Sequence, residues 1–374
     1  MTKYIDIHVL QTMPASNPNR GEDGLPKSVI YGGVNRARVS SQSWKRAMRQ
    51  YFNRQVDQDD AQDAAWLDDM RSRYIPTIIA EELEKRGMDK DEAEDRACAV
   101  ISNGVGGLTR DDSGKIRSTA LVMLSKGQLD RLIDFAQTVQ FEKTEKKSDK
   151  KSDPHTDATY KLPDKEAKKA LKDLLKANNS LALSVFGRMV ASDASLNVEA
   201  ASQVAHAFSV NSLVPEFDYF AAVDDADDAV GAGMIDNFGF NASTYYRYAN
   251  LNIDELKLNL DKGELVNKAI EYFIKAFVLS MPSGKQTSFA NKTLPSYVQV
   301  NVRDDTPVNL ASAFEKPVKP DFVENGIAKI EKELKTSELY VEKPTFTEVL
   351  TAEDSSLNKA KNLAELVEDT ISNL

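Results

Sequence analysis

Residues 40–52 read SSQSWKRAMRQYF, and their spacing predicts an amphipathic helix. Ser40 or Ser41 suits the N-cap, because a serine hydroxyl accepts from the free amides of the first turn. With 3.6 residues per turn, the apolar side chains fall on one arc of the helix: Trp44, Ala47, Met48 and Tyr51. The opposite arc carries one amide and three cations: Gln42, Lys45, Arg46 and Arg49. One face of this helix is therefore expected in a core and the other at the surface.

The outer face of this helix suits an anion. A solvated helix face normally mixes charges of both signs, whereas this arc carries cations and no acid. The free amides at a helix N-terminus add partial positive charge beside these side chains. The sequence therefore favours phosphate binding over an ordinary soluble surface.

The charge of the chain is unevenly distributed. The formal net charge is −10, which alone argues against nucleic acid as a partner. Residues 1–55 nevertheless hold nine Lys and Arg against three Asp and Glu, a balance of +6 that leaves −16 for the rest. A basic region on an acidic protein is compatible with a local anion site, since only the contact surface must be positive. The alternative is a chance cluster on a solvated face.

The rest of the chain predicts an α+β protein with insertions. Alternating residues predict strands at 3–11, 244–251 and 296–303, and periodic apolar residues predict helices at 267–281, 321–338 and 356–373. Residues 57–184 are helical in pattern and strongly charged, and they contain a polar, low-complexity stretch at 141–160 that predicts a mobile loop. Without the insertions, this is the skeleton of a βαββαβ sandwich that lacks one strand.

Three further segments are candidates for ligand contact. Gly187-Arg188-Met189 follows an apolar stretch, although a methionine there is also ordinary core filler. Tyr219 and Phe220 are adjacent in a strand-like segment, so one ring is expected to be exposed and able to stack on a nucleobase. SGKQTSF (283–289) is small and polar, and suits either backbone contacts or a plain loop.

Several function classes have little support in the sequence. There is no apolar run long enough for a membrane helix and no N-terminal signal pattern, so a cytoplasmic protein is expected. Cys98 is the only cysteine, and the three histidines are far apart, which argues against disulfides and a zinc site. No catalytic motif is found. The acids at 224–228 could bind Mg²⁺, but they are more typical of a solvated tip.

The sequence resembles the backbone subunit of the type I-E CRISPR Cascade complex, the CasC family. The resemblance covers most of the chain and rests on an ordered series of motifs: IDIHVL (5–10), YGGVNRARVSSQSWKRAMR (31–49), FGRM (186–189), QVAHAF (203–208), DYFAAVDD (218–225), YYRYANLN (245–252), PSGKQ (282–286) and NLASAFEKPV (309–318). The helical insertion and residues 141–160 match the family poorly.

This resemblance implies a fold and a domain layout. The expected fold is α+β, with an RRM-like (ferredoxin-like) palm formed by residues 1–57 and 185–374. A helical fingers domain is expected at 58–184, and a β-hairpin thumb at about 200–240. Copies are expected to stack head to tail along a guide RNA, because a heterologous contact that does not close produces a filament.

The resemblance also implies a non-catalytic, RNA-binding role without cofactor or metal. Family motifs and the basic cluster together give the expected RNA-binding residues: Arg20, Lys27, Arg38, Ser40, Ser41, Gln42, Lys45, Arg46, Arg49, Arg188, Met189, Tyr219, Phe220, Lys285 and Gln286. The implied partners are the crRNA guide, target DNA through that guide, other copies of the chain, and the large, small, guide-end-capping and guide-processing Cascade subunits. No membrane contact is expected.

Two other functions stay open at this point. Related backbone subunits in type III complexes cleave RNA with a metal, and a nuclease here would need an acid near the guide. A pure protein scaffold with an incidental basic patch would carry no nucleic acid.

Overall fold

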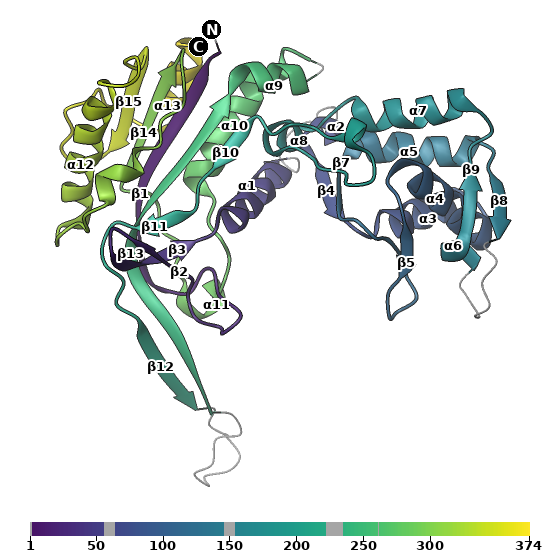
Figure 1. Ribbon diagram of the computed structural model, residues 1–374, viewed down its shortest axis with the longest axis horizontal. Coiled ribbons are helices and arrows are strands. Elements are labelled where there is room, and N and C mark those ends of the chain that lie inside the picture. Colours follow the sequence, from purple (N-terminus) through teal and green to yellow (C-terminus); the bar gives the residue numbers. More distant parts are fainter. Residues whose placement is uncertain (1, 56–63, 146–153, 222–234, 261) are drawn as a thin grey trace. The chain divides into compact units, whose positions relative to one another are not determined.

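The computed structural model of the chain describes residues 2–55, 64–145, 154–221, 235–260 and 262–374. The chain divides into two compact units. The first contains residues 1–51, 202–254 and 270–374, and the second contains residues 52–201 and 255–269. The sequence instead predicts domain boundaries at 57/58 and 184/185, and it places 255–269 in the palm. Figure 1 shows a sheet with helices against it in the first unit, and a largely helical second unit.

One antiparallel sheet organises the first unit. Its strand order is β15-β14-β1-β13-β11-β3-β2, and β10 and β12 also pair with β13. The strands are β1 (Tyr4–Ser16), β2 (Ser28–Tyr31), β3 (Val34–Val39), β10 (Ser202–Val204), β11 (Ala207–Ser209), β12 (Glu216–Ala221), β13 (Ile235–Asn252), β14 (Tyr297–Arg303) and β15 (Phe346–Thr351). The helical elements of the first unit are α1 (Ser41–Gln55), whose last residues belong to the second unit, α10 (Leu265–Leu279), whose first residues do so, α11 (Gln286–Phe289), η3 (Leu310–Phe314), α12 (Phe322–Ser337) and α13 (Leu363–Ser372). Helix α9 (Ile253–Asn259) falls mainly in the second unit.

The connections of this sheet follow the βαββαβ order. The path runs from β1 through α1 to β10 and β11, then through β13 and α10 to β14. The corresponding strands lie in the order β14-β1-β13-β11. The predicted α+β class is confirmed, and β10 and β11 supply the strand that the sequence pattern lacked. These two strands have three residues each, too few to show an alternating pattern.

Both faces of the sheet are covered. On one face, the buried guanidinium of Arg247 on β13 lies 3.7 Å from the ring centroid of Trp44 on α1 and 4.6 Å from that of Phe277 on α10. On the other face, residues of α12 and η3 pack against Leu10 of β1 and Tyr246 of β13. The apolar face of α1 therefore packs against the sheet, and the polar face of the helix points outward.

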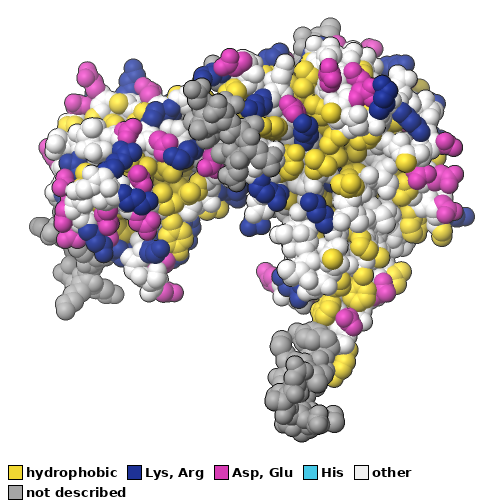
Figure 2. All heavy atoms as spheres, turned by 180° about the vertical axis from the view of Figure 1, so that it is seen from behind, with side chains coloured by type: hydrophobic (Ala, Val, Ile, Leu, Met, Phe, Trp, Pro, Cys, Tyr) yellow, Lys and Arg dark blue, Asp and Glu magenta, His cyan; other side chains and the backbone are white. Residues whose placement is uncertain are grey.

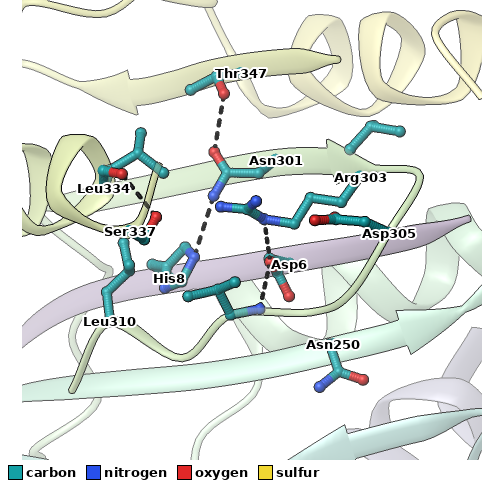
Figure 3. Close-up of polar contacts among 12 residues, drawn as sticks. Asp6, His8, Asn250, Asn301, Arg303, Asp305, Leu310, Leu334, Ser337 and Thr347 are labelled. Carbon is teal, nitrogen blue, oxygen red and sulfur yellow. Dashed lines mark hydrogen bonds and ion pairs between the residues drawn. The ribbon is translucent and has the colours of Figure 1, made fainter. Parts of the chain in front are cut away.

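Polar side chains are buried between the sheet and the segment after β14 (Figure 3). Asp6 on β1 is fully buried, and its carboxylate accepts from Arg303 Nε at 3.0 Å, from the Val308 amide at 3.0 Å and from the Tyr248 hydroxyl at 2.7 Å. Burial raises the pKa of Asp6 to about 6, although these donors favour its charged form. The buried ion pair of Asp6 and Arg303 thus links β1 to β14 and has a structural role.

His8 is the second titratable group of this buried layer. Its Nε2 lies 3.2 Å from Asn301 Nδ2, and its Nδ1 lies 2.9 Å from the Tyr246 hydroxyl. Since Asn301 Nδ2 can only donate, His8 Nε2 accepts and Nδ1 carries the proton. Burial, with Arg303 nearby, lowers the pKa of His8 to about 3.

We expect the neutral His8 to make folding sensitive to acid. A histidine with a lowered folded-state pKa stabilises the fold fully above its unfolded pKa of about 6.5, and this stabilisation is lost as pH falls toward 3. Asp6 acts in the opposite direction between pH 6 and 3.8, since its folded pKa is raised. The shift of His8 is larger, so the melting temperature should fall with acid. His8→Gln, which cannot bind this proton, should flatten the curve, and an unchanged pH profile would contradict the assignment.

The second unit has a helical core with short two-stranded sheets. Its helical elements are α2 (Ala64–Leu67), α3 (Ile75–Lys85), α4 (Lys90–Gly104), α5 (Lys126–Thr138), α6 (Pro154–Asp157), α7 (Lys165–Lys176), α8 (Leu181–Phe186) and η2 (Ala194–Leu196). Its described residues include the antiparallel pairs β4 (Asp69–Ser72) with β7 (Val122–Ser125), β5 (Leu108–Arg110) with β6 (Ile116–Ser118), and β8 (Glu142–Glu145) with β9 (Ala158–Lys161). The core contains Leu83, Val100, Leu132 and Leu171.

The prediction of one mobile loop at 141–160 needs correction. Residues 142–145 and 158–161 pair as β8 and β9, and Asp95 on α4 holds both ends of this hairpin. Its carboxylate accepts from Lys143 Nζ at 2.8 Å and from the Tyr160 hydroxyl at 2.8 Å, and it lies 2.7 Å from His155 Nδ1. The local sequence does not indicate these contacts, because Asp95 is far from the hairpin in sequence. Residues 146–153 lie outside the described part of the chain.

Candidate nucleic-acid interface

Helix α1 has the two faces that its sequence predicts. Trp44, Ala47 and Met48 are buried. On the opposite side, Gln42 and Arg46 are exposed, and Lys45 and Arg49 are half-buried. Burial lowers the pKa of Lys45, because a charged ammonium is less well solvated there.

Two segments that are distant in sequence contact the N-terminus of α1. The Ser40 amide donates to Asn19 Oδ1 at 2.9 Å, and the Ser41 amide donates to His206 Nδ1 at 2.8 Å. The Ser43 amide donates to the Ser40 carbonyl at 3.0 Å, as in the first turn of a helix. Ser40 is buried, and its hydroxyl accepts from the Ser43 amide at 3.4 Å, which gives it a capping role. The loop before β2 and the residue before β11 are thereby fixed against α1.

Cations from this loop and from β3 lie beside the same helix end. The Lys27 amide donates to the Asn19 carbonyl at 3.0 Å, and the Arg38 amide donates to the Lys27 carbonyl at 2.8 Å. Arg20 is exposed, and its backbone forms an isolated antiparallel β-bridge with Pro26 within the loop. Partial desolvation is the main cause that lowers the pKa of His206, and the charges of Arg38 and Lys27 lower it further.

A glycine brings the segment after α10 to this loop. A Cβ on Gly284 would lie 2.4 Å from the Pro18 carbonyl oxygen, so a larger residue cannot occupy this position without a backbone shift. Together with residues 18–22 and 24, Gly284 lines an open hollow of about 490 Å³. The next residue, Lys285, has its ammonium 5.3 Å from the ring centroid of Phe238. Gln286 starts α11 and donates to the Pro282 carbonyl at 3.2 Å.

The arm formed by β12 and the first part of β13 exposes aromatic rings. Phe217 and Tyr219 are 59% and 66% exposed, and, two residues apart in a strand, they share one face. Figure 2 shows hydrophobic side chains on this arm beside the residues drawn in grey. The predicted thumb is thus narrower than 200–240, because β10 and β11 belong to the sheet. The side chain of Phe220 and the acids at 224–228 lie outside the described residues.

Arg188 and Met189, in the second unit, have different environments. Met189 is 78% exposed, whereas Arg188 is 6% exposed. The guanidinium of Arg188 donates to the Leu196 carbonyl at 3.0 Å and to Gln128 Oε1 at 3.1 Å. Burial lowers its pKa to about 10. This corrects the prediction of an RNA contact for Arg188, because its guanidinium is buried and donates to groups within the second unit.

The structure brings most of the predicted residues of the first unit to the end and outer face of α1. These are Arg20, Lys27, Arg38, Ser41, Gln42, Lys45, Arg46 and Arg49, with Lys285 and Gln286 reaching the adjoining loop through Gly284. Sequence reasoning missed Asn19, His206 and Phe217. The alternation of Phe217 with Tyr219 was a usable signal, but no local pattern indicates that Asn19 and His206 contact α1.

Within the described residues, other kinds of site find no support. No group of three or more His, Cys, Asp or Glu side chains is arranged to hold a metal ion. A membrane-spanning helix is likewise not found in this part of the chain.

The comparisons with known proteins agree with the resemblance in the sequence. Residues 5–374 match the model of the CT1975-like protein family (Cas_CT1975), and the chain belongs to this family. One similar structure is titled a CRISPR RNA-guided surveillance complex in a pre-nicking state, with 30% identity, a TM-score of 0.83 and 99% of each chain covered. Another, titled a CRISPR RNA-guided surveillance complex, has 26% identity and a TM-score of 0.73, and covers 99% of this chain and 100% of the other. The search of curated proteins found no match.

Family and fold together define a subunit of a CRISPR surveillance complex of the Cascade class. The expected resemblance to the Cascade backbone subunit is confirmed.

Proposed function

We propose that this chain is the non-catalytic backbone subunit of a type I-E Cascade complex and holds the crRNA guide by its phosphates. The main support is the convergence at α1. Arg20, Lys27 and Arg38 come from the loop and β3, and Lys45 and Arg46 come from the helix. Phosphate contacts fix the register of RNA without reading its sequence. A subunit that must accept any guide needs this property.

In this arrangement the bases of the guide RNA stay free to pair with target DNA. When a protein binds the guide RNA through its phosphate backbone, it recognises the shape of that backbone. The target sequence is then recognised by base pairing with the guide. The aromatic arm of β12 and β13, and Met189, would then be placed against bases or against the next copy in a head-to-tail filament. In this proposal the remaining Cascade subunits bind the ends and sides of that filament in the cytoplasm.

The direct test is binding of the purified chain to a labelled, unstructured single-stranded RNA across a salt series. We expect affinity to fall with salt, with a slope of about −0.7 per phosphate contact in a log–log plot. RNAs of unrelated sequence should bind alike, and RNA incubated with Mg²⁺ should stay intact. A strong sequence preference or Mg²⁺-dependent cleavage would contradict the proposal.

Tyr219→Ala tests the aromatic arm separately. We expect RNA binding to weaken by about 5- to 150-fold, because one stacked base contributes about 1–3 kcal/mol. Since Tyr219 is 66% exposed, the unfolding free energy should change by less than about 0.5 kcal/mol. Phe220→Ala, from the sequence prediction, should also weaken binding or assembly more than stability.

Tyr340→Ala is the matched control for the arm, because Tyr340 is 85% exposed elsewhere in the first unit. It should bind RNA as the wild type does. A large drop in melting temperature for Tyr219→Ala, or equal effects of both variants on RNA binding, would count against a stacking role.

A further inference from the structure

His206 is fixed on both sides of its position in the chain. The amide of Ala205, the residue before it, donates to the Tyr248 carbonyl at 2.9 Å. The residue after it, Ala207, pairs with Val39 where β11 meets β3. The side chain of His206 is exposed, so the backbone holds it at the surface beside the end of β3, where α1 begins.

The contact with α1 fixes the tautomer of His206. The Ser41 amide can only donate, so His206 Nδ1, at 2.8 Å, accepts and carries no proton. In the neutral ring, the proton is then on Nε2, which becomes a donor. Partial desolvation of the ring and the nearby charges of Arg38 and Lys27 lower the pKa of His206, which favours this neutral form.

We infer that His206 donates a hydrogen bond from Nε2 to a backbone oxygen of the guide RNA, with the first amide of α1 holding its tautomer. This inference rests on the proposed function and adds a residue of a different kind to it. Lys27, Arg38 and Lys45 are cations, and each phosphate they neutralise releases counterions. A neutral donor releases none, so its contribution should persist at high salt.

Two variants separate this role from a purely structural one. In His206→Asn, the amide oxygen takes the place of Nδ1 and can still accept from Ser41, but the donor at the Nε2 position is lost. In His206→Gln, the longer amide places a donor near the Nε2 position and loses the contact with Ser41. A capping role alone would be disturbed mainly in the Gln variant, and a donor role mainly in the Asn variant.

The experiment measures binding of the full chain to a labelled, unstructured single-stranded RNA at several salt concentrations, with melting temperatures as a folding check. We expect His206→Asn to bind about tenfold more weakly with an unchanged salt slope, and His206→Gln to recover part of this loss. Lys45→Gln, as the cationic reference, should lower both the affinity and the salt slope, by about 0.7.

Each outcome has a defined meaning. Wild-type affinity in His206→Asn would overturn the inference, and a reduced salt slope in that variant would show a charged histidine instead of a neutral donor. DNA of the same sequence identifies the acceptor: an equal loss on DNA assigns a phosphate oxygen, and a loss confined to RNA assigns the 2′-hydroxyl. If the wild-type chain bound no RNA, the proposed function itself would fail.

Discussion

Lys45→Glu is expected to weaken binding of the guide RNA by about a hundredfold and to leave the fold intact. Lys45 lies on the outward face of α1, one turn after Ser41, and its side chain is half-buried. A charged hydrogen bond to phosphate is worth about 1.5–3 kcal/mol, and the reversed charge adds repulsion. The same reasoning applies to Arg49→Glu, which we expect to lose guide RNA as well.

The control for this substitution is Lys335→Glu, which makes the same charge change at an exposed position of α12 in the first unit. It should retain wild-type affinity. Circular dichroism and melting temperature should show that all variants fold, and Lys45→Gln gives the effect without repulsion. If the Lys45→Glu variant still bound guide RNA with the salt dependence of the wild type, the proposed role of α1 in RNA binding would be contradicted.

Arg303→Met is expected to lower the free energy of unfolding by about 3–5 kcal/mol. The guanidinium of Arg303 and the carboxylate of Asp6 are both fully buried, with Nε and Oδ2 3.0 Å apart. Removal of the cation leaves a buried carboxylate without its counter-charge, which is the costly case for an ion pair. Denaturant unfolding measures the change, and RNA binding of the folded fraction should persist.

The pH dependence of this loss identifies its cause. The pKa of Asp6 is already raised to about 6, and the loss of Arg303 should raise it further, since the cation favours the charged form. The destabilisation should therefore be largest near pH 8 and shrink at pH 5, where the carboxyl group takes up a proton. A change below about 1 kcal/mol, or one independent of pH, would contradict a role for the ion pair.

The fold was predictable where periodicity is long. Helix α10 and strand β14 each repeat their apolar pattern over enough residues to be recognised. The three-residue strands β5 and β6 are too short for such a pattern, and they form through partners across a turn. The last helix was predicted from residue 356 but begins at Leu363, because residues 358–360 instead run beside Val349 on β15.

The candidate site was predictable only in part, because residue type does not reveal burial. Arg188 and Arg46 look alike in sequence, yet one donates to carbonyls inside the second unit and the other is exposed on α1. Asn19 and His206 are ordinary polar residues until the fold places them against the amides of Ser40 and Ser41. Such long-range contacts depend on tertiary structure and leave no local signal.

The central claim is that this chain holds a guide RNA inside a surveillance complex. The most direct measurement is purification of the tagged chain from cells that contain its partner subunits and guide array. The ratio of nucleic-acid to protein absorbance then shows whether the complex contains nucleic acid. A denaturing gel of the extracted nucleic acid shows its length. We predict one RNA species of discrete length, lost in Lys45→Glu and kept in Lys335→Glu. A complex that contains the partners but no RNA would contradict the claim and indicate a protein scaffold.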